Sequence, residues 1–388
     1  MTRVMIVAAR RTPFGRFRGK LSQYGPVELG MFAARAALDG LDAVRIDSVV
    51  VGNVLSAGHG MNVARQIGVQ AGVLLSAPAY TVNMMCASGM QAVLLAAQAI
   101  RTGESRAVLC GGTESMSQSG LLLPRPPRDA APNLDAVIDT MQRDGLVDSF
   151  SHRHMAETVE DLARESQITR EMQDAFALRS QQRYEIAREA GRFRDELAAV
   201  GDVTEDEHPR PGTTLESLAG LKPAFGDAGT ITAGNASGVN DGAAMLVLAD
   251  EDFARQQGWR LLAELEAGAV VGCDPQRMGY GPVHALGELC RRQLSHLADY
   301  DTLEINEAFA AQTLACLRRM GLSTTDDATP QSCNPDGGAI AVGHPIGASG
   351  ARLVAHLAWK IARGESQRAA AALCVGGGMG IATALRSS

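Results

Sequence analysis

Several features that would mark a membrane, secreted or nucleic-acid-binding protein are missing from this chain. No apolar run reaches the roughly 20 residues needed to span a bilayer, so we expect no contact with a membrane. No long run of basic residues occurs and the net charge is −7, which argues against a general nucleic-acid-binding protein. The seven cysteines include no C-x-x-C pair, so neither a disulfide framework nor a zinc knuckle is expected, and a reducing, cytoplasmic location fits better.

Aromatic residues are also scarce, at 4% of 388 residues, whereas glycine is abundant with 42 residues. Many backbone segments are therefore expected to pass close to one another or to a ligand. With 46% hydrophobic residues, the chain has enough apolar material for two or three packed units. Strands predicted at 3–9, 48–55 and 106–112 alternate with helices at 28–38 and 87–100. This alternation predicts an α/β fold with a helix-covered, parallel sheet.

An internal repeat and an insertion divide the chain. Ala-Ser-Gly occurs at 87–89 and 348–350, and Gly-Glu-Ser occurs at 103–105 and 364–366, at one fixed separation. Such matches indicate a duplicated strand-helix-strand unit. Between the copies, a proline-rich loop at 124–132 and a charged helical stretch at 157–190 differ in composition. We therefore predict a first half at 1–117, to which the chain returns at 241–262, an inserted loop domain at 118–240, and a second half at 263–388.

Cys86 stands where an extended segment meets the helix predicted from residue 87 onward. Unpaired N–H groups and the positive end of the dipole at a helix start favour a thiolate, the form that attacks electrophiles. The alternative is that Cys86 is a small buried hydrophobic residue, which is the commoner role of a single cysteine. A nucleophilic role requires a base and an oxyanion site elsewhere in the chain.

The second copy of the repeat offers both. His344 lies in a glycine-dense segment just before a helix, and the repeat would bring both helix starts to one pseudo-twofold axis. His344 is therefore a candidate base for Cys86, although a single histidine is more often structural. Cys374 is followed by glycines at 376–378, whose N–H groups would line an oxyanion hole. A phosphate-binding loop is the alternative for these glycines, but the Lys-Ser/Thr of a P-loop is missing.

Five motifs, in order along the chain, resemble the signatures of the thiolase family: MCASG at 85–89, GGTESMS at 111–117, NEAFA at 306–310, GGAIAVGHPIG at 337–347 and CVGGG at 374–378. The resemblance covers essentially the whole chain. It implies the thiolase fold, in which two duplicated halves, each a mixed five-stranded sheet flanked by helices, stack as α/β/α/β/α layers with an inserted loop domain. Ala87 departs from the glycine that many family members carry beside the nucleophile.

The resemblance also implies roles for individual residues. Cys86 matches the nucleophile that forms an acyl-enzyme, His344 the group that takes its proton, and Cys374 the acid and base at the α-carbon of acetyl-CoA. Asn306 would hold a water near the enolate oxygen, and the N–H groups of Cys86 and Gly376 would form the other oxyanion site. Together these groups meet the needs of making or breaking a carbon–carbon bond β to a thioester.

Further matches imply contacts with the substrate. Arg210, Ser217 and Ser237 match positions around coenzyme A, and the acyl pocket would be lined by His154, Met155, Met278, Ala308 and Phe309. Without the resemblance, Arg210 would be a solvated charge and Ser217 a helix cap. His154 also forms a His-x-His pair with His152, which suggests half of a metal site, but nothing nearby in the sequence completes it and no metal is expected.

The implied activity is that of an acetyl-CoA C-acetyltransferase, which interconverts two acetyl-CoA with acetoacetyl-CoA and uses coenzyme A as a substrate, without a cofactor. The alternatives are a degradative 3-ketoacyl-CoA thiolase with a broader chain range, a decarboxylating ketoacyl synthase, and a CoA-binding scaffold with an inactive site. Cys374 argues against the synthase, and the intact set of Cys86, His344 and Cys374 argues against the scaffold. Family analogy further predicts a homo-oligomer, either a dimer or a tetramer.

Overall fold

A computed structural model describes residues 2–226, 228–322 and 333–388. Most of its strands belong to one mixed sheet, ten-stranded over the described residues, with the order β10-β11-β12-β9-β1-β8-β5-β3-β4 and with β2 paired to β8. The strands are β1 (Val4–Arg11), β2 (Gly15–Arg16), β3 (Ser48–Gly52), β4 (Ala79–Val82), β5 (Ala107–Ser115), β6 (Leu121–Leu122), β7 (Ile138–Asp139), β8 (Asn240–Asp250), β9 (Ala263–Gly272), β10 (Thr302–Ile305), β11 (Arg368–Val375) and β12 (Met379–Arg386). The predicted strand at 48–55 therefore ends earlier, at Gly52.

The sheet consists of two units with the same pairing pattern. In the first, β1, β8 and β5 pair antiparallel, and β5, β3 and β4 pair parallel. In the second, β9, β12 and β11 pair antiparallel, and β10 follows in parallel, with an isolated parallel bridge from Leu303 to Cys333 at the place of a fifth strand. The repeated order is what the duplicated tripeptides predict. The units are joined edge to edge, because Met5 and Ile6 of β1 pair with β9, so they are not separate sheets.

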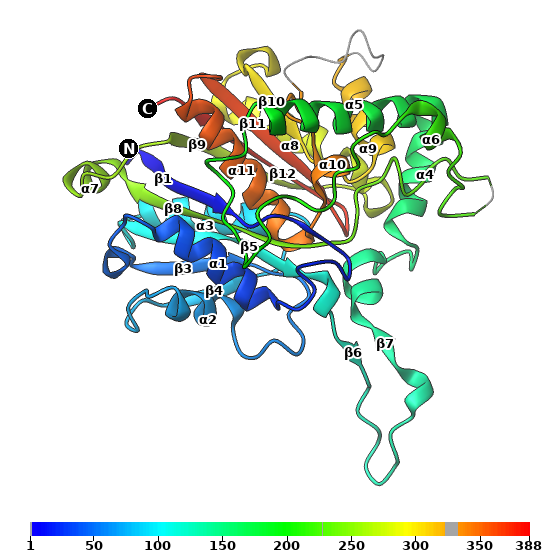
Figure 1. Cartoon of the computed structure of the whole chain (residues 1–388), viewed down its shortest axis with the longest axis horizontal. Coiled ribbons are helices and arrows are strands. Elements are labelled where there is room, and N and C mark those ends of the chain that lie inside the picture. Colours follow the sequence, from blue (N-terminus) through cyan, green and yellow to red (C-terminus); the bar gives the residue numbers. More distant parts are fainter. Residues whose placement is uncertain (1, 227, 323–332) are drawn as a thin grey trace.

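Helices lie on both faces of each unit (Figure 1). α1 and α2 cover the outer face of the first unit, α8 covers that of the second, and α3 and α11 share the core between the units. These layers give the predicted α/β/α/β/α arrangement. The helices are α1 (Pro26–Leu38), α2 (Val63–Gln70), α3 (Ser88–Arg101), α4 (Met155–Glu165), α5 (Arg170–Glu189), α6 (Leu215–Ala219), α7 (Glu251–Gln256), α8 (Gly281–Gln293), α9 (Ala310–Arg319), α10 (Ala339–Val342) and α11 (Ile346–Ala362).

The repeated Ala-Ser-Gly has a packing cause. A Cβ atom on Gly89 would lie 2.8 Å from the carbonyl oxygen of Gly347, and one on Gly350 would lie 2.7 Å from the backbone nitrogen of Met90. Both distances are shorter than real Cβ contacts, so glycine at these positions lets the first turns of α3 and α11 meet. The starts of α3 and α11 are thereby held together. Cys86 lies just before the first of these helices, and His344 lies just before the second.

The inserted segment differs from its prediction in one respect. The stretch at 157–190 is not a single helix: α4 ends at Glu165, and α5 begins at Arg170 after a turn whose Thr169 side chain caps the backbone N–H of Met172. The threonine hydroxyl competes for the backbone at this point and starts a new helix. The apolar faces of α4, α5 and α9 then pack into one cluster, which attaches the insertion to the second unit.

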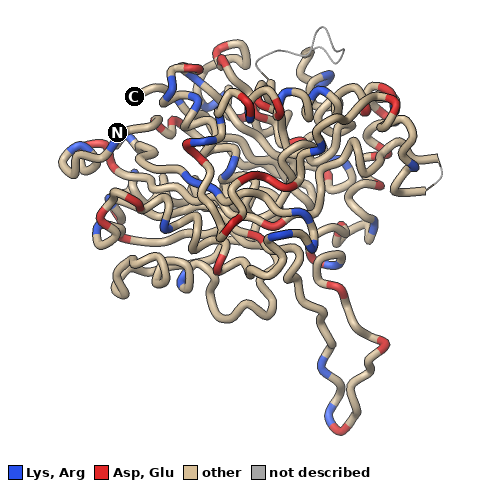
Figure 2. The backbone as a smooth tube through the Cα atoms, in the orientation of Figure 1, with Lys and Arg blue, Asp and Glu red and all other residues tan. Residues whose placement is uncertain are grey.

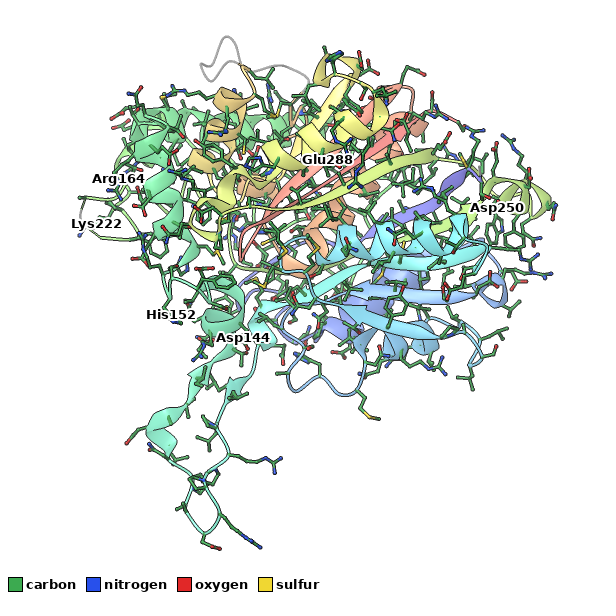
Figure 3. All side chains as sticks on the ribbon, turned by 180° about the vertical axis from the view of Figure 1, so that it is seen from behind. Asp144, His152, Arg164, Lys222, Asp250 and Glu288 are labelled. Atoms are coloured by element: carbon green, nitrogen blue, oxygen red, sulfur yellow. The ribbon has the colours of Figure 1, made fainter. Side chains whose placement is uncertain are left out.

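A two-stranded arm, formed by β6 and β7, leaves the body of the molecule (Figure 1). Asp144 and His152 lie where the arm meets the body (Figure 3). Leu121 and Leu134 on the arm are 72% and 73% exposed.

Basic and acidic residues are interspersed over the chain in the view of Figure 2. Within the described ranges, no helix is both long and apolar enough to cross a membrane.

Candidate active site

Cys86 sits in a tight turn between β4 and α3. Met85, just before it, has a positive φ of 49°, a left-handed conformation that is uncommon for a residue with a side chain. The hydroxyl of Ser88 holds this turn, because it accepts the N–H of Met84 at 2.9 Å and donates to the carbonyl of Met85 at 2.7 Å. Ala87 adopts ordinary right-handed helical angles, so its methyl group requires no strain. The sharp turn presents the Cys86 side chain at the start of the helix.

The thiol of Cys86 is not the thiolate that its helix position predicts. Burial raises its pKa to about 11, even though the backbone N–H groups of Gly376 and of Cys86 itself hydrogen-bond the sulfur and oppose the rise. The expectation was wrong because desolvation of the charged form outweighs the favourable dipole and N–H groups. A base is therefore needed to take the proton when Cys86 attacks. The two N–H groups that the sequence assigns to an oxyanion site both lie at the Cys86 sulfur.

His344 is held by the loop before α11. Its backbone N–H donates to Asn240 Oδ1 at 2.9 Å, and its ring Nδ1 lies 2.6 Å from Ser349 Oγ. Burial lowers the pKa of His344 to about 4, so the ring is neutral at physiological pH. The other ring nitrogen, Nε2, is buried and has no hydrogen-bond partner within the described part of the chain. A neutral imidazole with a free nitrogen is suited to accept a proton.

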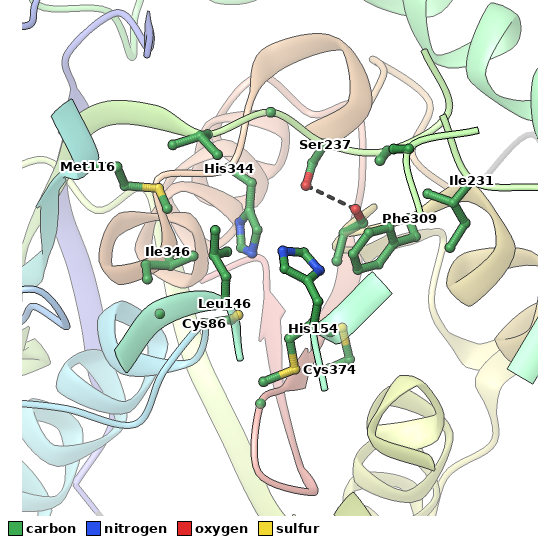
Figure 4. Close-up of a pocket in the computed structure, with 18 of the residues that line it drawn as sticks. Cys86, Met116, Leu146, His154, Ile231, Ser237, Phe309, His344, Ile346 and Cys374 are labelled. Atoms are coloured by element: carbon green, nitrogen blue, oxygen red, sulfur yellow. Dashed lines mark hydrogen bonds between the residues drawn. The ribbon is translucent and has the colours of Figure 1, made fainter. Parts of the chain in front are cut away.

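Cys374 is at the end of β11, with Gly376 just beyond it. Burial, followed by the neighbouring cysteines including Cys86, raises the pKa of Cys374 well above its ordinary value. A Cβ atom on Gly376 would lie 2.6 Å from Cε of Met155, the end of a flexible side chain that would have to shift to admit it. Cys86, His344 and Cys374 thus come from three segments that are far apart in the sequence and lie around one pocket (Figure 4).

These groups line a cavity of about 290 Å³ with mainly apolar walls. Ten of the predicted site residues line it: Cys86, His154, Met155, Ser237, Met278, Ala308, Phe309, His344, Cys374 and Gly376. Ser237 is fixed at the wall because its hydroxyl donates to the carbonyl of Ala308 at 2.9 Å. The side chain of His154 stacks on Phe225, with ring centroids 4.4 Å apart.

Three predicted residues do not line this cavity. Asn306 is buried, and its Nδ2 has no hydrogen-bond partner among the residues that the structure describes. Arg210 is exposed and donates to the carbonyl of Ala233, a residue of the cavity wall. Ser217 is exposed inside α6, whose N-cap is Thr214 and not Ser217; the two side chains bond each other's backbone N–H groups, so Ser217 takes part in the capping from within the helix.

Sequence reasoning missed one wall of the cavity. Gln142, Gly145 and Leu146 belong to a π-helical turn, Met141–Leu146, that follows the arm and lines the cavity. No periodicity or motif marks a π-helical turn, although such turns are frequent at functional sites. Met116 and Phe225 were missed as well, and Met116 lies in the GGTESMS motif that was assigned to the family as a whole.

Over the described residues, no group of three or more His, Cys, Asp or Glu side chains is placed to hold a metal ion. In particular, Nδ1 of His154 accepts the N–H of Ala156 at 3.1 Å at the start of α4. This contact makes His154 a helix cap whose remaining nitrogen, Nε2, is the one that can face a ligand.

Comparisons with known proteins agree with the fold over its whole length. Family models described as "Thiolase, N-terminal domain" and "Thiolase, C-terminal domain" match residues 4–252 and 259–387. The acetyl-CoA acetyltransferase of Cupriavidus necator is 45% identical and the mitochondrial 3-ketoacyl-CoA thiolase of Bos taurus 41% identical, each match covering at least 98% of both chains. A crystal structure of human mitochondrial 3-ketoacyl-CoA thiolase in complex with CoA is 40% identical, with a TM-score of 0.93 and coverage of 100% of this chain and 98% of that chain.

The duplicated fold and these matches define an acyltransferase enzyme. The chain belongs to the thiolase family.

Proposed function

We propose that this enzyme is an acetyl-CoA C-acetyltransferase that interconverts two acetyl-CoA with acetoacetyl-CoA through an acyl-enzyme on Cys86. The observation that carries the proposal is the convergence of Cys86, His344 and Cys374 on one cavity, with the N–H of Gly376 on the Cys86 sulfur. The names of the relatives from Cupriavidus necator and Allochromatium vinosum, each 45% identical, support the same activity.

In the first half-reaction, Cys86 attacks the thioester carbonyl of acetyl-CoA while His344 Nε2 takes the thiol proton. The N–H groups of Cys86 and Gly376 stabilise the oxyanion that forms. The bond between the acetyl carbon and the CoA sulfur then breaks, and the leaving thiolate takes the proton of Cys374. The products are CoA and acetyl-Cys86, with a thiolate on Cys374 beside an imidazolium on His344.

In the second half-reaction, the Cys374 thiolate removes a proton from the α-carbon of a second acetyl-CoA. His344 and a water held by Asn306 stabilise the enolate oxygen, and the enolate carbon attacks the carbonyl of acetyl-Cys86. The new carbon–carbon bond releases acetoacetyl-CoA, and Cys86 leaves with the proton of the imidazolium. All three groups return to their starting protonation states, so the same site also runs in the direction of thiolysis.

Coenzyme A enters this scheme as a substrate, and no cofactor is required. We assign all three polar residues to coenzyme A. Arg210 would contact its nucleotide end, Ser237 would contact its pantetheine arm, and Ser217 would lie near the bound coenzyme. The position of Arg210 beside Ala233 at the cavity wall supports this assignment. A structural neighbour whose title names a complex with CoA supports it as well.

A second candidate is a degradative 3-ketoacyl-CoA thiolase with a broader chain range, acting in fatty acid metabolism. It is favoured by the methionine-rich wall, since Met85, Met116, Met155 and Met278 all line the cavity and methionine side chains adapt to ligands of different length. The bovine relative carries that name.

The deciding experiment is CoA-dependent thiolysis of acetoacetyl-CoA and 3-ketooctanoyl-CoA, compared by kcat/KM on one preparation, with Cys86→Ala as the inactive control. A strong preference for acetoacetyl-CoA supports the acetyltransferase. Comparable values, or a preference for the longer chain, support the second candidate. Activity on neither substrate, with Cys86 still reactive toward iodoacetamide, would refute both.

We further propose that the enzyme is a cytoplasmic homo-oligomer. All seven cysteines are free, which fits a reducing compartment.

Two surfaces are available for contact with a second copy. β4 ends the sheet order, so its outer edge is unpaired in that order, and the exposed leucines of the arm offer a further contact. Light scattering on a variant with Leu121→Asp and Leu134→Asp should show a smaller assembly than the parent. The control is Leu294→Asp, at a leucine that is 95% exposed but lies outside the arm; an unchanged mass for the arm variant would exclude the arm as a contact.

A further inference from the structure

His344, the base of the proposed reaction, has one ring contact among the described residues, from Nδ1 to Ser349. Ser349 lies in the first turn of α11 and is 2% exposed. Its hydroxyl oxygen is 2.6 Å from Nδ1 of His344 and donates to the carbonyl oxygen of Pro345 at 2.9 Å. The three groups form a short chain of hydrogen bonds behind the cavity wall.

The direction of this chain follows from the number of protons. A serine hydroxyl has one hydrogen, and a carbonyl oxygen only accepts, so we assign the Ser349 hydrogen to its contact with Pro345, whose carbonyl also accepts the backbone N–H groups of Ala348 and Ser349 at 3.0 Å each. The contact with His344 then has Nδ1–H as the donor and Ser349 Oγ as the acceptor. In a neutral ring the proton is therefore on Nδ1, and the lone pair is on Nε2. Nε2 is the nitrogen that is buried without a partner among the described residues, in a ring that lines the cavity together with Cys86.

We propose that Ser349 is a positioning residue that holds His344 in the Nδ1–H tautomer, with Nε2 aimed at Cys86. The inference rests on the proposed function, since it requires Cys86 as nucleophile and His344 as its base. Ser349 touches neither substrate nor the reacting atoms and acts only through the imidazole. The same contact serves after proton transfer, because an imidazolium still donates from Nδ1.

The other half of the molecule supports the assignment. Ser88 occupies the matching position of the repeated Ala-Ser-Gly and likewise donates to a carbonyl of the loop before its helix, that of Met85. Its oxygen accepts the backbone N–H of Met84, which fixes the nucleophile turn. The duplicated serine thus donates to a nearby preceding carbonyl in both halves, three residues back in the first and four residues back in the second, and its oxygen contacts the nucleophile turn in one half and the base in the other.

Over residues 2–226, 228–322 and 333–388, no charged group hydrogen-bonds the His344 ring. The titratable side chains that share the cavity wall with His344 are Cys86, Cys374 and His154. The buried carboxylate of Glu114, on β5 behind the wall, accepts the N–H of Gly347 and three donors of the segment after β3. It makes no recorded bond to the His344 ring, so Ser349 alone holds the ring nitrogen in the described structure.

The test compares Ser349→Ala with the isosteric pair Ser349→Thr and Ser349→Val, which have the same shape and differ in the hydroxyl. The readouts are the single-turnover rate of Cys86 acylation by acetoacetyl-CoA, the rate of Cys86 alkylation by iodoacetamide, and the split between kcat and KM. The matched control is Ser105→Ala, since Ser105 is also a buried serine but bonds the Ser48 hydroxyl away from the cavity.

We expect Ser349→Ala and Ser349→Val to acylate about 10- to 100-fold more slowly, as loss of an orienting partner does at other sites, with KM changed by less than about threefold. Ser349→Thr should recover most of the rate, and Ser105→Ala should match the parent. Equal acylation by the Thr and Val variants, both folded, would overturn the inference. If the parent itself forms no acyl-enzyme, the proposed function fails; if the parent acylates and Ser349→Val matches it, only the role of Ser349 fails.

Discussion

The reactivity of Cys86 depends on two opposing influences on its thiol. Burial raises the pKa of the thiol to about 11, and the N–H groups of Gly376 and Cys86 work against that rise. His344, whose pKa burial lowers to about 4, is neutral over most of the accessible pH range and does not form a resting ion pair with the thiol. The free enzyme is therefore expected to hold Cys86 as a thiol and to ionise it only during attack.

This state of Cys86 has a measurable signature in alkylation. Because only the thiolate reacts, the rate of alkylation by iodoacetamide should rise about tenfold per pH unit between about pH 6 and pH 9. Mass spectrometry of the Cys86 peptide after timed quenching gives this rate, with Cys86→Ala as the blank. A rate that levels off below about pH 7 would instead indicate a thiolate–imidazolium pair and contradict the burial argument.

Replacing Cys374 should affect the two half-reactions, acylation of Cys86 and condensation, to different extents. Cys374→Ala is expected to form acetyl-Cys86 within about tenfold of the parent rate, because the CoA thiolate can leave without its proton. Condensation of acetyl-CoA should fall by about 10²–10⁴-fold, the usual contribution of a positioned acid or base. Rapid quench measures the first step, and acetoacetyl-CoA formation measures the second. Cys290→Ala, a substitution on the buried face of α8, is the control. A condensation rate equal to that of the parent in Cys374→Ala would refute the proton-transfer role.

At the scale of elements, the meeting of α3 and α11 depends on two glycines. A Cβ atom on Gly89 would lie 2.8 Å from the Gly347 oxygen and 2.9 Å from the backbone nitrogen of Ala351. These neighbours are backbone atoms of α11 and cannot rotate away. Gly89→Ala is therefore expected to lower the free energy of unfolding by about 1–3 kcal/mol and to reduce acylation, since Cys86 and His344 would move apart.

Gly287 provides the matched control for this prediction. It is exposed in the middle of α8, and a Cβ atom there would meet nothing within 4 Å. Gly287→Ala should raise the free energy of unfolding by about 0.5–1 kcal/mol through helix propensity alone, with unchanged acylation. Denaturant melts of both variants make the comparison. If Gly89→Ala were as stable as Gly287→Ala, the close approach of the helices would not be the reason for the repeated glycine.

The elements that could be predicted from the sequence are those with a local signal. The buried strand at β5, the helix after Cys86 and the duplicated order follow from apolar runs and repeated tripeptides. The break between α4 and α5 was missed because Thr169 offers a cap without proline or glycine nearby. The edge pairing of β1 with β9 was missed because it is a contact between distant segments, for which no residue pattern exists. The π-helical wall at Met141–Leu146 was missed because no periodicity or motif marks a π-helical turn.

At the scale of the whole molecule, a buried cluster of charges links the two units and the insertion. His356 of α11 lies between Glu196 of the insertion, at 2.9 Å, and Asp336 of the second unit, at 3.1 Å. Arg11 of β1 donates to Glu196 at 2.7 Å, and Lys360 donates to Asp336 at 2.7 Å. The cluster lies outside the catalytic cavity, so its effect should be on stability.

The pKa shifts in this cluster set the pH range in which it stabilises the fold. Burial opposes the charge on His356, but Glu196 and Asp336 raise its pKa from 6.5 to about 9. A raised folded-state pKa contributes stability that is fully present below about pH 6.5 and is lost as the pH rises toward 9. Burial likewise opposes the charge on Glu196, but Arg11 and His356 lower its pKa from 4.5 to about 2, so that its contribution is lost as the pH falls below 4.5. The cluster is therefore most stabilising between about pH 4.5 and 6.5.

His356→Gln tests this linkage across the molecule. The variant leaves two buried carboxylates without their shared cation, so at about pH 6 its free energy of unfolding should be about 3 kcal/mol below that of the parent. The difference in the free energy of unfolding between parent and variant should become smaller toward pH 9. Over that range the parent loses the stability that charged His356 contributes, and the variant has no such contribution to lose. Thermal melts at matched ionic strength from about pH 6 to 9 measure the gap, with His284→Gln, at an exposed position of α8, as the control. Parallel loss of stability in the parent and His356→Gln would mean that His356 is neutral in the folded protein, so that the pairs of Arg11 with Glu196 and of Arg192 with Asp336 carry the ionic link to the insertion.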